Sequence, residues 1–407
     1  MKKSFLNLAM AALFLAPVTF NSCKDDKPDN APIEQGDTWE GNILKGNITK
    51  AMKLDASVTY TLSAPLIIEN GGKLIIPAGT TIKAQQGFDK YILVAQGGQI
   101  FANGTADKPV TMTSAAANPK AEDWGGLIIN GYAPLAGGET ASAEINTDYK
   151  YGGNKVDDNS GVLTYVTIAY TGARNSAEVE HNGLTLNGVG NGTKIENIYI
   201  PYSADDGVEF FGGSVHVKNL FVLNSDDDCF DVTQGWTGTL ENAYGMWSKS
   251  YSSTEADPRG IEVDGNFDGN FPNQTGQSNF TMKNITIDLR LDPIAKDHPD
   301  FAAKSMQDVI KIRRGATCNI INALVKGTGT AQDLIDITDS KGAGNPASVI
   351  SLTNALVNPF TGKDINFNAE QLYDGVHAFG SDVSKLKIQA GNTGCPTDIF
   401  AWTKYQF

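Results

Sequence analysis

The feature that most constrains this 407-residue chain is an internal repeat. Its period falls between about 22 and about 26 residues, and self-similarity at such a period indicates a solenoid. Gly71–Ile75 returns one period later as Gly97–Phe101, and a shorter echo covers Gly125–Gly131. An Asn before a short apolar strand recurs at Asn197, Asn219, Asn242, Asn284, Asn322 and Asn354. The first two gaps each span one period, and the longer gaps fit repeats with loop insertions.

The strand chemistry narrows the solenoid to one architecture. The apolar runs are short, rich in Val, Ile, Thr, Tyr and Phe, and bounded by Gly and Asn, with no amphipathic helix of about ten or more residues. The sequence therefore predicts an all-β fold, a right-handed parallel β-helix with loop insertions and capped ends. A β-sandwich repeats every ~8–12 residues and a propeller blade every ~40–50, so neither fits. The recurring Asn is expected to form an inward stack at a turn, a structural role.

The chain divides into four predicted parts. Residues 1–22 read as a signal peptide, 23–38 as a lipidated tether, 39–360 as the β-helix, and 361–407 as a C-terminal coil and cap. A basic start and an apolar run to Phe20 support the signal peptide. The segment ending at Cys23 resembles a bacterial lipobox in the looser form used by Bacteroidetes, which implies lipidation of Cys23. The alternative is an unlipidated signal peptide followed by a solvated linker.

Composition sets limits on partners. The formal charge is −14, which argues against nucleic-acid binding, since that needs a basic face. After the signal peptide no run of about 20 apolar residues follows, so the membrane is expected to be reached only through the lipid anchor. Lys24–Lys27 resembles the tag of surface-exported Bacteroidetes lipoproteins. We therefore expect a monomer anchored in the outer membrane and facing the cell exterior.

Paired acids are the strongest chemical signal. Asp206 and Asp228 are one period apart, and so are Glu209 and Asp231. One coil of that length places each pair on adjacent strands. Adjacent strands are about 4.8 Å apart. Two like charges so close raise the pKa of one of the two carboxyl groups unless a metal, a basic side chain or a shared proton balances them.

Two segments, Ala204–Glu209 and Ser225–Phe230, resemble the first active-site motifs of polygalacturonase-type glycoside hydrolases. The resemblance implies an inverting enzyme with Asp227 as general acid, and with Asp206 and Asp228 holding the attacking water. The family's Asn is replaced by Ala204, and its Gly-His-Gly motif is missing because residues 244–262 contain no His. Asp-Gly turns on repeating coils give the same residues without catalysis.

A candidate metal site follows at Glu262, Asp264, Asn266 and Asp268. Oxygen ligands at alternate positions before a Gly match the start of a Ca²⁺-binding loop. The twelfth loop position is Thr275 and not Glu, which excludes an EF-hand. The alternative is a turn rich in Asn, Asp and Gly.

Long insertions at 132–160, 247–280 and 288–308 supply candidate sugar-binding aromatics. The rings of Tyr151, Trp236, Trp247 and Tyr251 are expected either to stack on sugars or to shield the flank of the coil.

The basic strand residues Lys311 and Arg313 are expected on a solvated outer face, with the base of a polysaccharide lyase as the alternative. Pairing of Cys318 with Cys395 is left open.

The body from residue 39 onward resembles the right-handed β-helix lipoproteins of Bacteroidetes. The segments that carry this resemblance are Ile75–Thr80, Asn182–Leu186, Asp205–Gly213 and Trp402–Thr403. The resemblance implies a fold and a surface location but no settled chemistry. We predict a lipoprotein that binds a polysaccharide or surface glycan without cleaving it. The alternatives are a hydrolase or lyase acting on an acidic polysaccharide, and a structural or adhesive surface protein.

Overall fold

The computed structural model describes residues 35–176, 179–357 and 361–407. The predicted signal peptide, Cys23 and most of the tether lie outside the described residues. No helix in the described ranges is long and apolar enough to cross a membrane.

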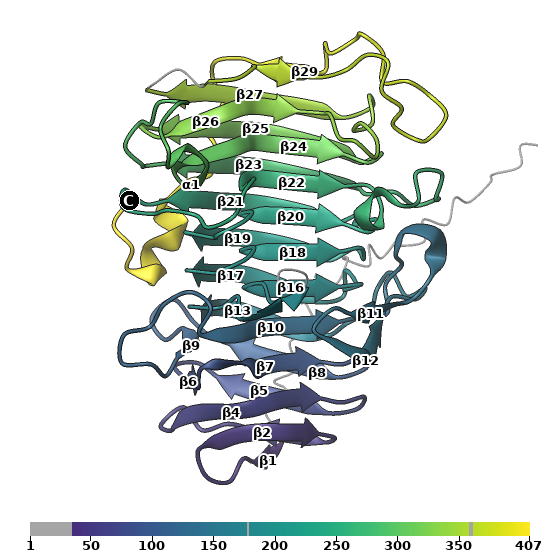
Figure 1. Ribbon diagram of the computed structural model, residues 1–407. Helices are drawn as coiled ribbons and strands as arrows, with labels where there is room; N and C mark the ends of the chain where they lie inside the picture. Colours follow the sequence, from purple (N-terminus) through teal and green to yellow (C-terminus); the bar gives the residue numbers. More distant parts are fainter. Residues whose placement is uncertain (1–34, 177–178, 358–360) are drawn as a thin grey trace, which may run out of the picture. The chain divides into compact units, whose positions relative to one another are not determined.

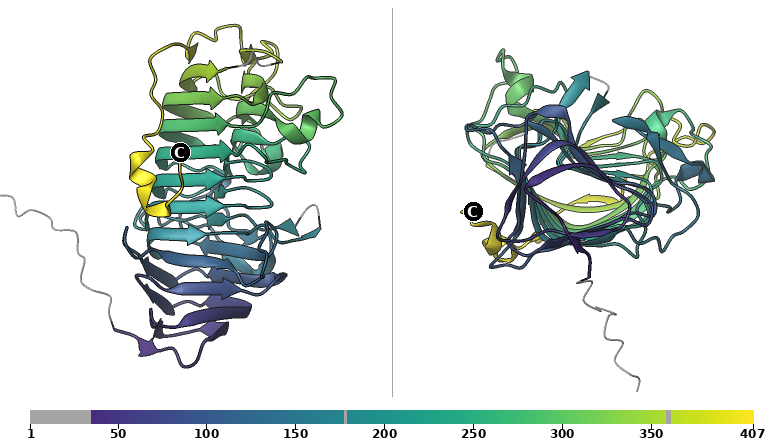
Figure 2. Two further views of the ribbon diagram at one scale, coloured as in Figure 1. Left: turned by 90° about the vertical axis from the view of Figure 1, so that its left-hand side faces the viewer. Right: turned by 90° about the horizontal axis from the view of Figure 1, so that it is seen from below.

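The described body is a right-handed parallel β-helix, as the repeat predicts (Figures 1 and 2). Each coil passes through three sides, and each side stacks in parallel on the same side of the next coil. Viewed along the stack, the three sides enclose a triangular interior (Figure 2). Within the described residues the main sheet contains 25 strands.

The first stack, which carries the site described below, contains in spatial order β2 (Ile43–Ile48), β4 (Thr59–Ile68), β7 (Gly87–Val94), β10 (Trp124–Asn130), β16 (Leu184–Asn187), β18 (Val208–Phe211), β20 (Phe230–Thr233), β22 (Arg259–Asp264), β24 (Ser305–Arg313), β26 (Thr330–Asp336) and β28 (Ile365–Asn366). The second contains β1 (Asp37–Thr38), β3 (Ala51–Lys53), β5 (Lys73–Pro77), β8 (Gln99–Asn103), β13 (Gly161–Ile168), β17 (Lys194–Pro201), β19 (His216–Leu223), β21 (Thr239–Trp247), β23 (Asn279–Leu289), β25 (Thr317–Gly327), β27 (Val349–Leu356) and β29 (Leu386–Ile388). The third begins with the first halves of β2 and β4, followed by β6 (Thr81–Ala84) and β9 (Val110–Ser114). It continues with the second halves of the long strands of the second stack, from β13 to β27.

The remaining elements lie in the insertions and at the C-terminal end. Two antiparallel hairpins are β11 (Ala141–Ala143) with β12 (Asn146–Tyr151), and β14 (Arg174–Ser176) with β15 (Val179–Glu180). The short helices are η1 (Ala136–Gly138), η2 (Phe267–Gly269), α1 (Phe301–Lys304) and η3 (Asp398–Thr403).

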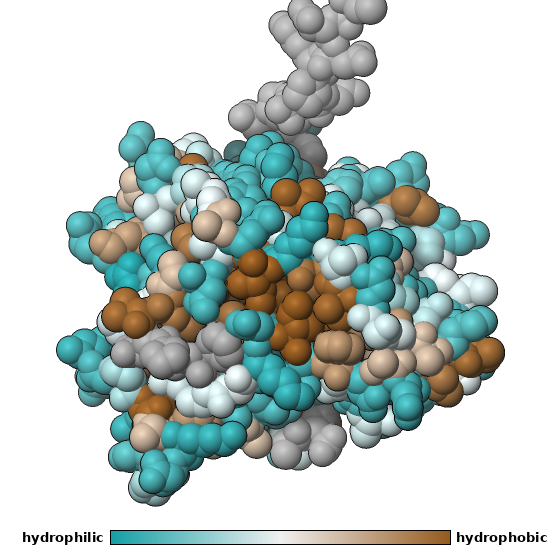
Figure 3. Space-filling view, turned by 90° about the horizontal axis from the view of Figure 1, so that it is seen from above, coloured by the Kyte–Doolittle hydropathy of each residue, from teal (hydrophilic) through white to brown (hydrophobic). Residues whose placement is uncertain are grey.

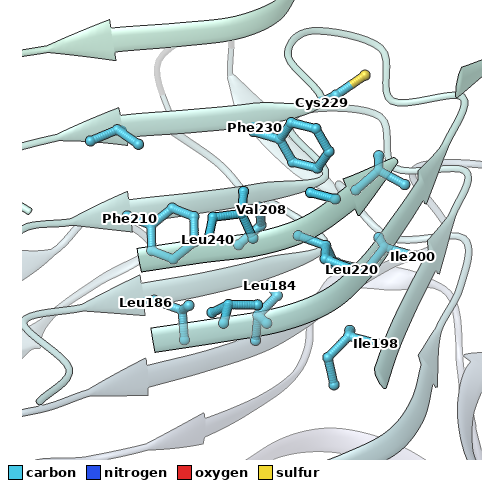
Figure 4. Packing of buried hydrophobic residues seen from close by; sticks show 14 of the residues in the cluster. Leu184, Leu186, Ile198, Ile200, Val208, Phe210, Leu220, Cys229, Phe230 and Leu240 are labelled. Carbon is cyan, nitrogen blue, oxygen red and sulfur yellow. The ribbon is translucent and has the colours of Figure 1, made fainter. Parts of the chain in front are cut away.

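Alternation along each short strand decides which side chains enter the core. In β18, Val208 and Phe210 are fully buried, and the residue between them points outward. Figure 4 shows these two with Leu184, Leu186 and Phe230, which stack on one another inside the coil. Each such side chain stabilises the fold by about 1.5–3 kcal/mol when fully buried.

The C-terminal end departs from the predicted Asn repeat. Asn354 pairs with Val325 after a register shift, so it falls outside the predicted Asn stack. Residues 361–407, predicted as a coil and cap, add only the short pairings of β28 and β29 to the last long coil. Figure 3 shows apolar side chains between polar ones on this end of the stack. The chain then runs back along the flank, and η3 packs beside β19 (Figure 2).

Candidate functional site

Outward side chains of the first stack form a column of carboxylates. Glu209 of β18 lies beside Asp231 of β20, which lies beside Glu262 of β22. Adjacent strands are about 4.8 Å apart, so these three acids stand one above another and are named the acid column. Lys311 of β24 and Asp336 of β26 continue the line. The one-period spacing predicted the Glu209–Asp231 register correctly.

The acid column lines a hollow of about 650 Å³, named the outer groove. Its walls include the β11–β12 hairpin and the loop that carries η2. Phe267 and Phe271 line the groove from this loop and are 48% and 50% exposed. Ligand sites typically measure about 300–1,000 Å³, so the groove has room for a small ligand or a few sugar rings.

Glu209 and Asp231 form a hydrogen-bonded carboxyl pair. Burial, followed by repulsion from Asp231, holds the pKa of Glu209 well above its usual range. Burial also raises the pKa of Asp231. Asn182 Nδ2 donates a hydrogen bond to Glu209 Oε2 at 2.6 Å. Because two carboxyl groups in such contact share a proton, this pair stays partly protonated where an exposed acid is ionised.

Arginines neutralise the next two acids. Arg259 and Arg313 both form ion pairs with Glu262. Arg313 Nε lies 2.6 Å from Asp264 Oδ1, and Arg314 Nη1 lies 2.6 Å from Asp264 Oδ2. Burial, then the neighbouring arginines, lowers the pKa of Arg313 to about 10, so it remains charged at neutral pH. These ion pairs oppose the effect of burial on the two carboxylates, but burial still holds the pKa of Asp264 well above its usual range.

Ion pairs also occupy the loop expected to bind Ca²⁺. Arg314 Nη1 lies 2.6 Å from Asp264 and 3.4 Å from Asp268. Asn266 is buried and donates a hydrogen bond to the backbone carbonyl of Arg314 at 3.1 Å. Glu262, the fourth expected ligand, is paired with arginine. A guanidinium group thus contacts two of the expected ligands, Asp264 and Asp268, and the Ca²⁺ site stays a prediction.

Asp206 and Asp228, two of the three predicted catalytic acids, hold the turns before β18 and β20. Asp206 Oδ1 accepts a hydrogen bond from the Asp228 backbone N–H at 2.9 Å. Asp228 Oδ1 accepts one from the Arg259 backbone N–H at 2.7 Å. Both side chains are buried, and burial raises the pKa of each well above its usual range. Each carboxyl group joins its coil to the next one.

Asp227, the third predicted catalytic acid, converges with other carboxylates. One oxygen from each of Asp205, Asp206 and Asp227 lies within 4.8 Å of the other two. Asp227 Oδ1 is buried without a hydrogen-bond partner. Burial raises the pKa of Asp227 to about 7. Sequence reasoning missed Asp205, although its place before Asp206 in an Asp-Asp pair was a usable signal. Asp228 approaches Asp231 of the acid column instead.

Residues 46–406 match the family model described as a pectate-lyase-like beta helix domain. The chain belongs to this family. Comparison with curated proteins and with solved structures gave no match. Family membership agrees with the parallel β-helix. The Bacteroidetes lipoprotein origin remains a prediction.

This pectate-lyase-like domain uses the four predicted sugar-binding aromatics differently. Trp236 and Trp247 have no exposed surface, so the prediction is wrong for both: their rings pack inside the coil. Tyr151 lines the groove but is almost buried, and its hydroxyl donates to Gln234 Oε1 at 2.7 Å. Tyr251 packs on Trp247 with ring centroids 5.3 Å apart.

Three further residues singled out by their sequence context are buried in the domain. Lys311, expected on a solvated face, is 7% exposed and lies 2.8 Å from Asp336 and 3.7 Å from Asp308. The solvated-face prediction is therefore wrong for Lys311, because the side chain is buried and paired with two neighbouring acids. Cys318 and Cys395 are both free and belong to separate apolar clusters.

Proposed function

We propose that this chain binds a segment of polysaccharide in the outer groove. The observation that carries the proposal is the groove itself, a hollow of about 650 Å³ on the outer face of successive coils. Stacked parallel strands present a regular surface on which an extended chain of sugars can lie along one direction. The family's relation to polysaccharides supports the same ligand class.

The lining of the groove suits sugar rings. Phe267 and Phe271 offer exposed aromatic faces to the apolar face of a pyranose. Glu209, Asn182 and Gln234 supply oxygens that accept hydrogen bonds from sugar hydroxyls. A mixture of aromatic walls and polar floor fixes a ligand by shape and by hydrogen bonding together.

Hydrolysis is the second candidate function, and the raised pKa of Asp227 favours it. An acid whose pKa is about 7 is suited to donate a proton near neutral pH. An inverting hydrolase needs its two carboxyl groups about 6.5–9.5 Å apart, with water between them. The oxygens of Asp206 and Asp227 approach within 4.8 Å, and Asp206 already holds a backbone amide. This geometry supports binding ahead of inverting cleavage.

A glycan array followed by calorimetry on the best ligand tests binding. Phe267→Ala and Phe271→Ala are each expected to weaken affinity roughly 3- to 10-fold, the loss of one aromatic contact. Ile321→Ala removes a side chain of 41% exposure on the outer face of β25, away from the groove lining, and is the matched control. Equal affinity in all three variants would place the ligand elsewhere. An array without any glycan hit would favour the adhesive-protein alternative.

Cleavage is tested on the same ligands by reducing-sugar release and by absorbance at about 235 nm, which reports the unsaturated product of a lyase. We expect no turnover above that of Asp227→Asn. Turnover that disappears in this variant would replace the binding proposal with the hydrolase.

The cellular location stays a proposal that concerns residues outside the described ranges. We expect lipidation at Cys23 and display on the outer membrane surface. Metabolic labelling with a fatty acid, compared between the natural chain and Cys23→Ala, tests the anchor.

A further inference from the structure

We propose that the outer groove recognises a polysaccharide that carries protonated amines, and that it discriminates against uronates. This inference rests on the proposed glycan-binding function and adds the charge class of the ligand. It comes from the balance between charged groups in the groove.

Acids dominate the lining of the groove. Eight lining residues are Asp or Glu, two are Arg, and none is Lys or His. A cleft lined by one sign of charge concentrates ligands of the opposite sign and repels those of the same sign. A polyuronate would bring a carboxylate on every sugar into this field.

Both lining arginines are already committed to protein carboxylates. Arg313 is paired with Glu262 and Asp264. Arg314 lies 2.6 Å from Asp264 and 3.2 Å from Asp339. A uronate could gain a guanidinium partner only by breaking one of these pairs, which would leave a buried protein carboxylate uncompensated.

The Glu209–Asp231 carboxyl pair in the lining of the groove lacks such a direct partner. Burial outweighs the charges of Arg313 and Arg259, which lower the pKa of Asp231. Among the described residues, neither Glu209 nor Asp231 forms a direct ion pair with a basic side chain. Asp231 Oδ1 is buried and accepts no hydrogen bond. Burial, then repulsion from Asp231, holds the pKa of Glu209 above its usual range, and the ionised form lacks a directly paired cation in the part of the chain that the structure describes. A bound ammonium group would supply that cation.

A second, independent acceptor lines the same groove. Asn187 is 2% exposed and lies on the outward face of β16, with Leu186 beside it pointing into the core. Asn187 Nδ2 donates to Asn130 Oδ1 at 2.9 Å, while Asn187 Oδ1 has no partner. The groove therefore offers acceptors that lack donors. An ammonium group carries three donors and no acceptor, so it complements this arrangement.

Calorimetry with three hexasaccharides tests which ligand charge the groove prefers. They are β1–4-linked glucosamine, its fully N-acetylated form, and galacturonate. The first two share one backbone and differ in charge. We expect the glucosamine hexamer to bind at least about 10-fold more tightly than either of the others, and its affinity to fall with added salt.

Variants of the carboxyl pair test whether these two side chains produce the preference for the amine. Glu209→Gln and Asp231→Asn each keep the shape of the side chain and are expected to weaken binding of the glucosamine hexamer about 10-fold while changing binding of the acetylated form little. Glu241→Gln, in β21 and outside the groove, is the matched control and should keep full affinity. Unchanged affinity in both groove variants overturns the proposal. Thermal melts of each variant confirm that it is folded.

The outcomes also separate this inference from the proposed function. If the acetylated hexamer binds as tightly as the amine and Phe271→Ala weakens both, glycan binding stands and the charge inference fails. If the galacturonate hexamer binds best, alone or only with added Ca²⁺, the charge inference also fails. If no hexamer binds and the wider array is empty, both fail.

Discussion

At the scale of single residues, one asparagine at a corner of the coil adopts a left-handed backbone conformation and links neighbouring coils. Five of them have φ between 56° and 59°, a left-handed conformation that Asn adopts more readily than most residues: Asn197, Asn219, Asn242, Asn284 and Asn322. Each Nδ2 from Asn219 onward donates to the previous Oδ1 at 2.8–2.9 Å, across gaps as long as 42 residues. The repeat predicted this stack because it depends on one local residue preference.

Asn242 provides the test of that ladder. Asn242→Ala removes a donor and an acceptor and places Ala in the left-handed region, so we expect a loss of about 2–4 kcal/mol in the free energy of unfolding. Asn242→Gly removes the same hydrogen bonds but tolerates the backbone, and its loss should be about 1 kcal/mol smaller. Urea denaturation measures both. If Gly costs as much as Ala, backbone conformation contributes nothing at this corner.

The buried acids make the free energy of unfolding depend on pH. The folded protein keeps a proton on Asp227 up to about pH 7, whereas the unfolded chain loses it near the ordinary value of 3.8, because burial raises the folded pKa. Folded protein therefore binds more protons between these values, and the free energy of unfolding falls as pH rises through them. For Asp227 alone the fall is roughly 2–4 kcal/mol.

Denaturation of Asp227→Asn between pH 5 and pH 8 checks the sign. The variant should lose less stability over this range than the natural chain and should be the more stable of the two at pH 8. Asp148→Asn neutralises an exposed carboxyl on β12 and is the control that should keep the natural slope. A steeper loss in Asp227→Asn would contradict the assigned pKa direction.

At the scale of elements, the C-terminal segment acts as a strap along the third side of the coil. The backbone N–H groups of Thr393 and Gly394 donate to Asn322 Oδ1 at 2.7 and 3.3 Å, which closes the end of the Asn ladder. Phe400 then packs against Phe221 and Met246 in an apolar cluster outside the main core. The sequence did not predict this docking, because contacts between segments so far apart leave no periodic signal.

Phe400→Ala is expected to destabilise the protein by about 3–5 kcal/mol, since its ring is fully buried. Glycan affinity should stay unchanged at temperatures where the variant is folded. Phe271→Ala is the converse control: its ring is 50% exposed, so affinity should fall while the melting temperature changes little. Equal melting temperatures for Phe400→Ala and Phe271→Ala would show that the strap does not contribute to stability.

At the scale of the whole molecule, the sequence predicted the solenoid and part of the site. Strand register is local and repetitive, so the one-period spacing identified Glu209 and Asp231 as neighbours. The groove walls come from insertions whose contacts are not periodic, such as Tyr151 with Gln234, 83 residues apart. For the same reason the burial of Trp236 could not be read from its position between strands. The sequence shows that a residue is aromatic, but not whether its side chain points into the coil or outward.

The place where a bound glycan lies on the protein can be measured directly. Hydrogen–deuterium exchange is compared for the free protein and for the protein saturated with the best array ligand. We expect slower exchange in the β11–β12 hairpin, the η2 loop and the first-stack strands β16, β18, β20 and β22, with β17, β19 and β21 unchanged. Protection confined to the second or third side, or absent from the η2 loop, would contradict this expectation.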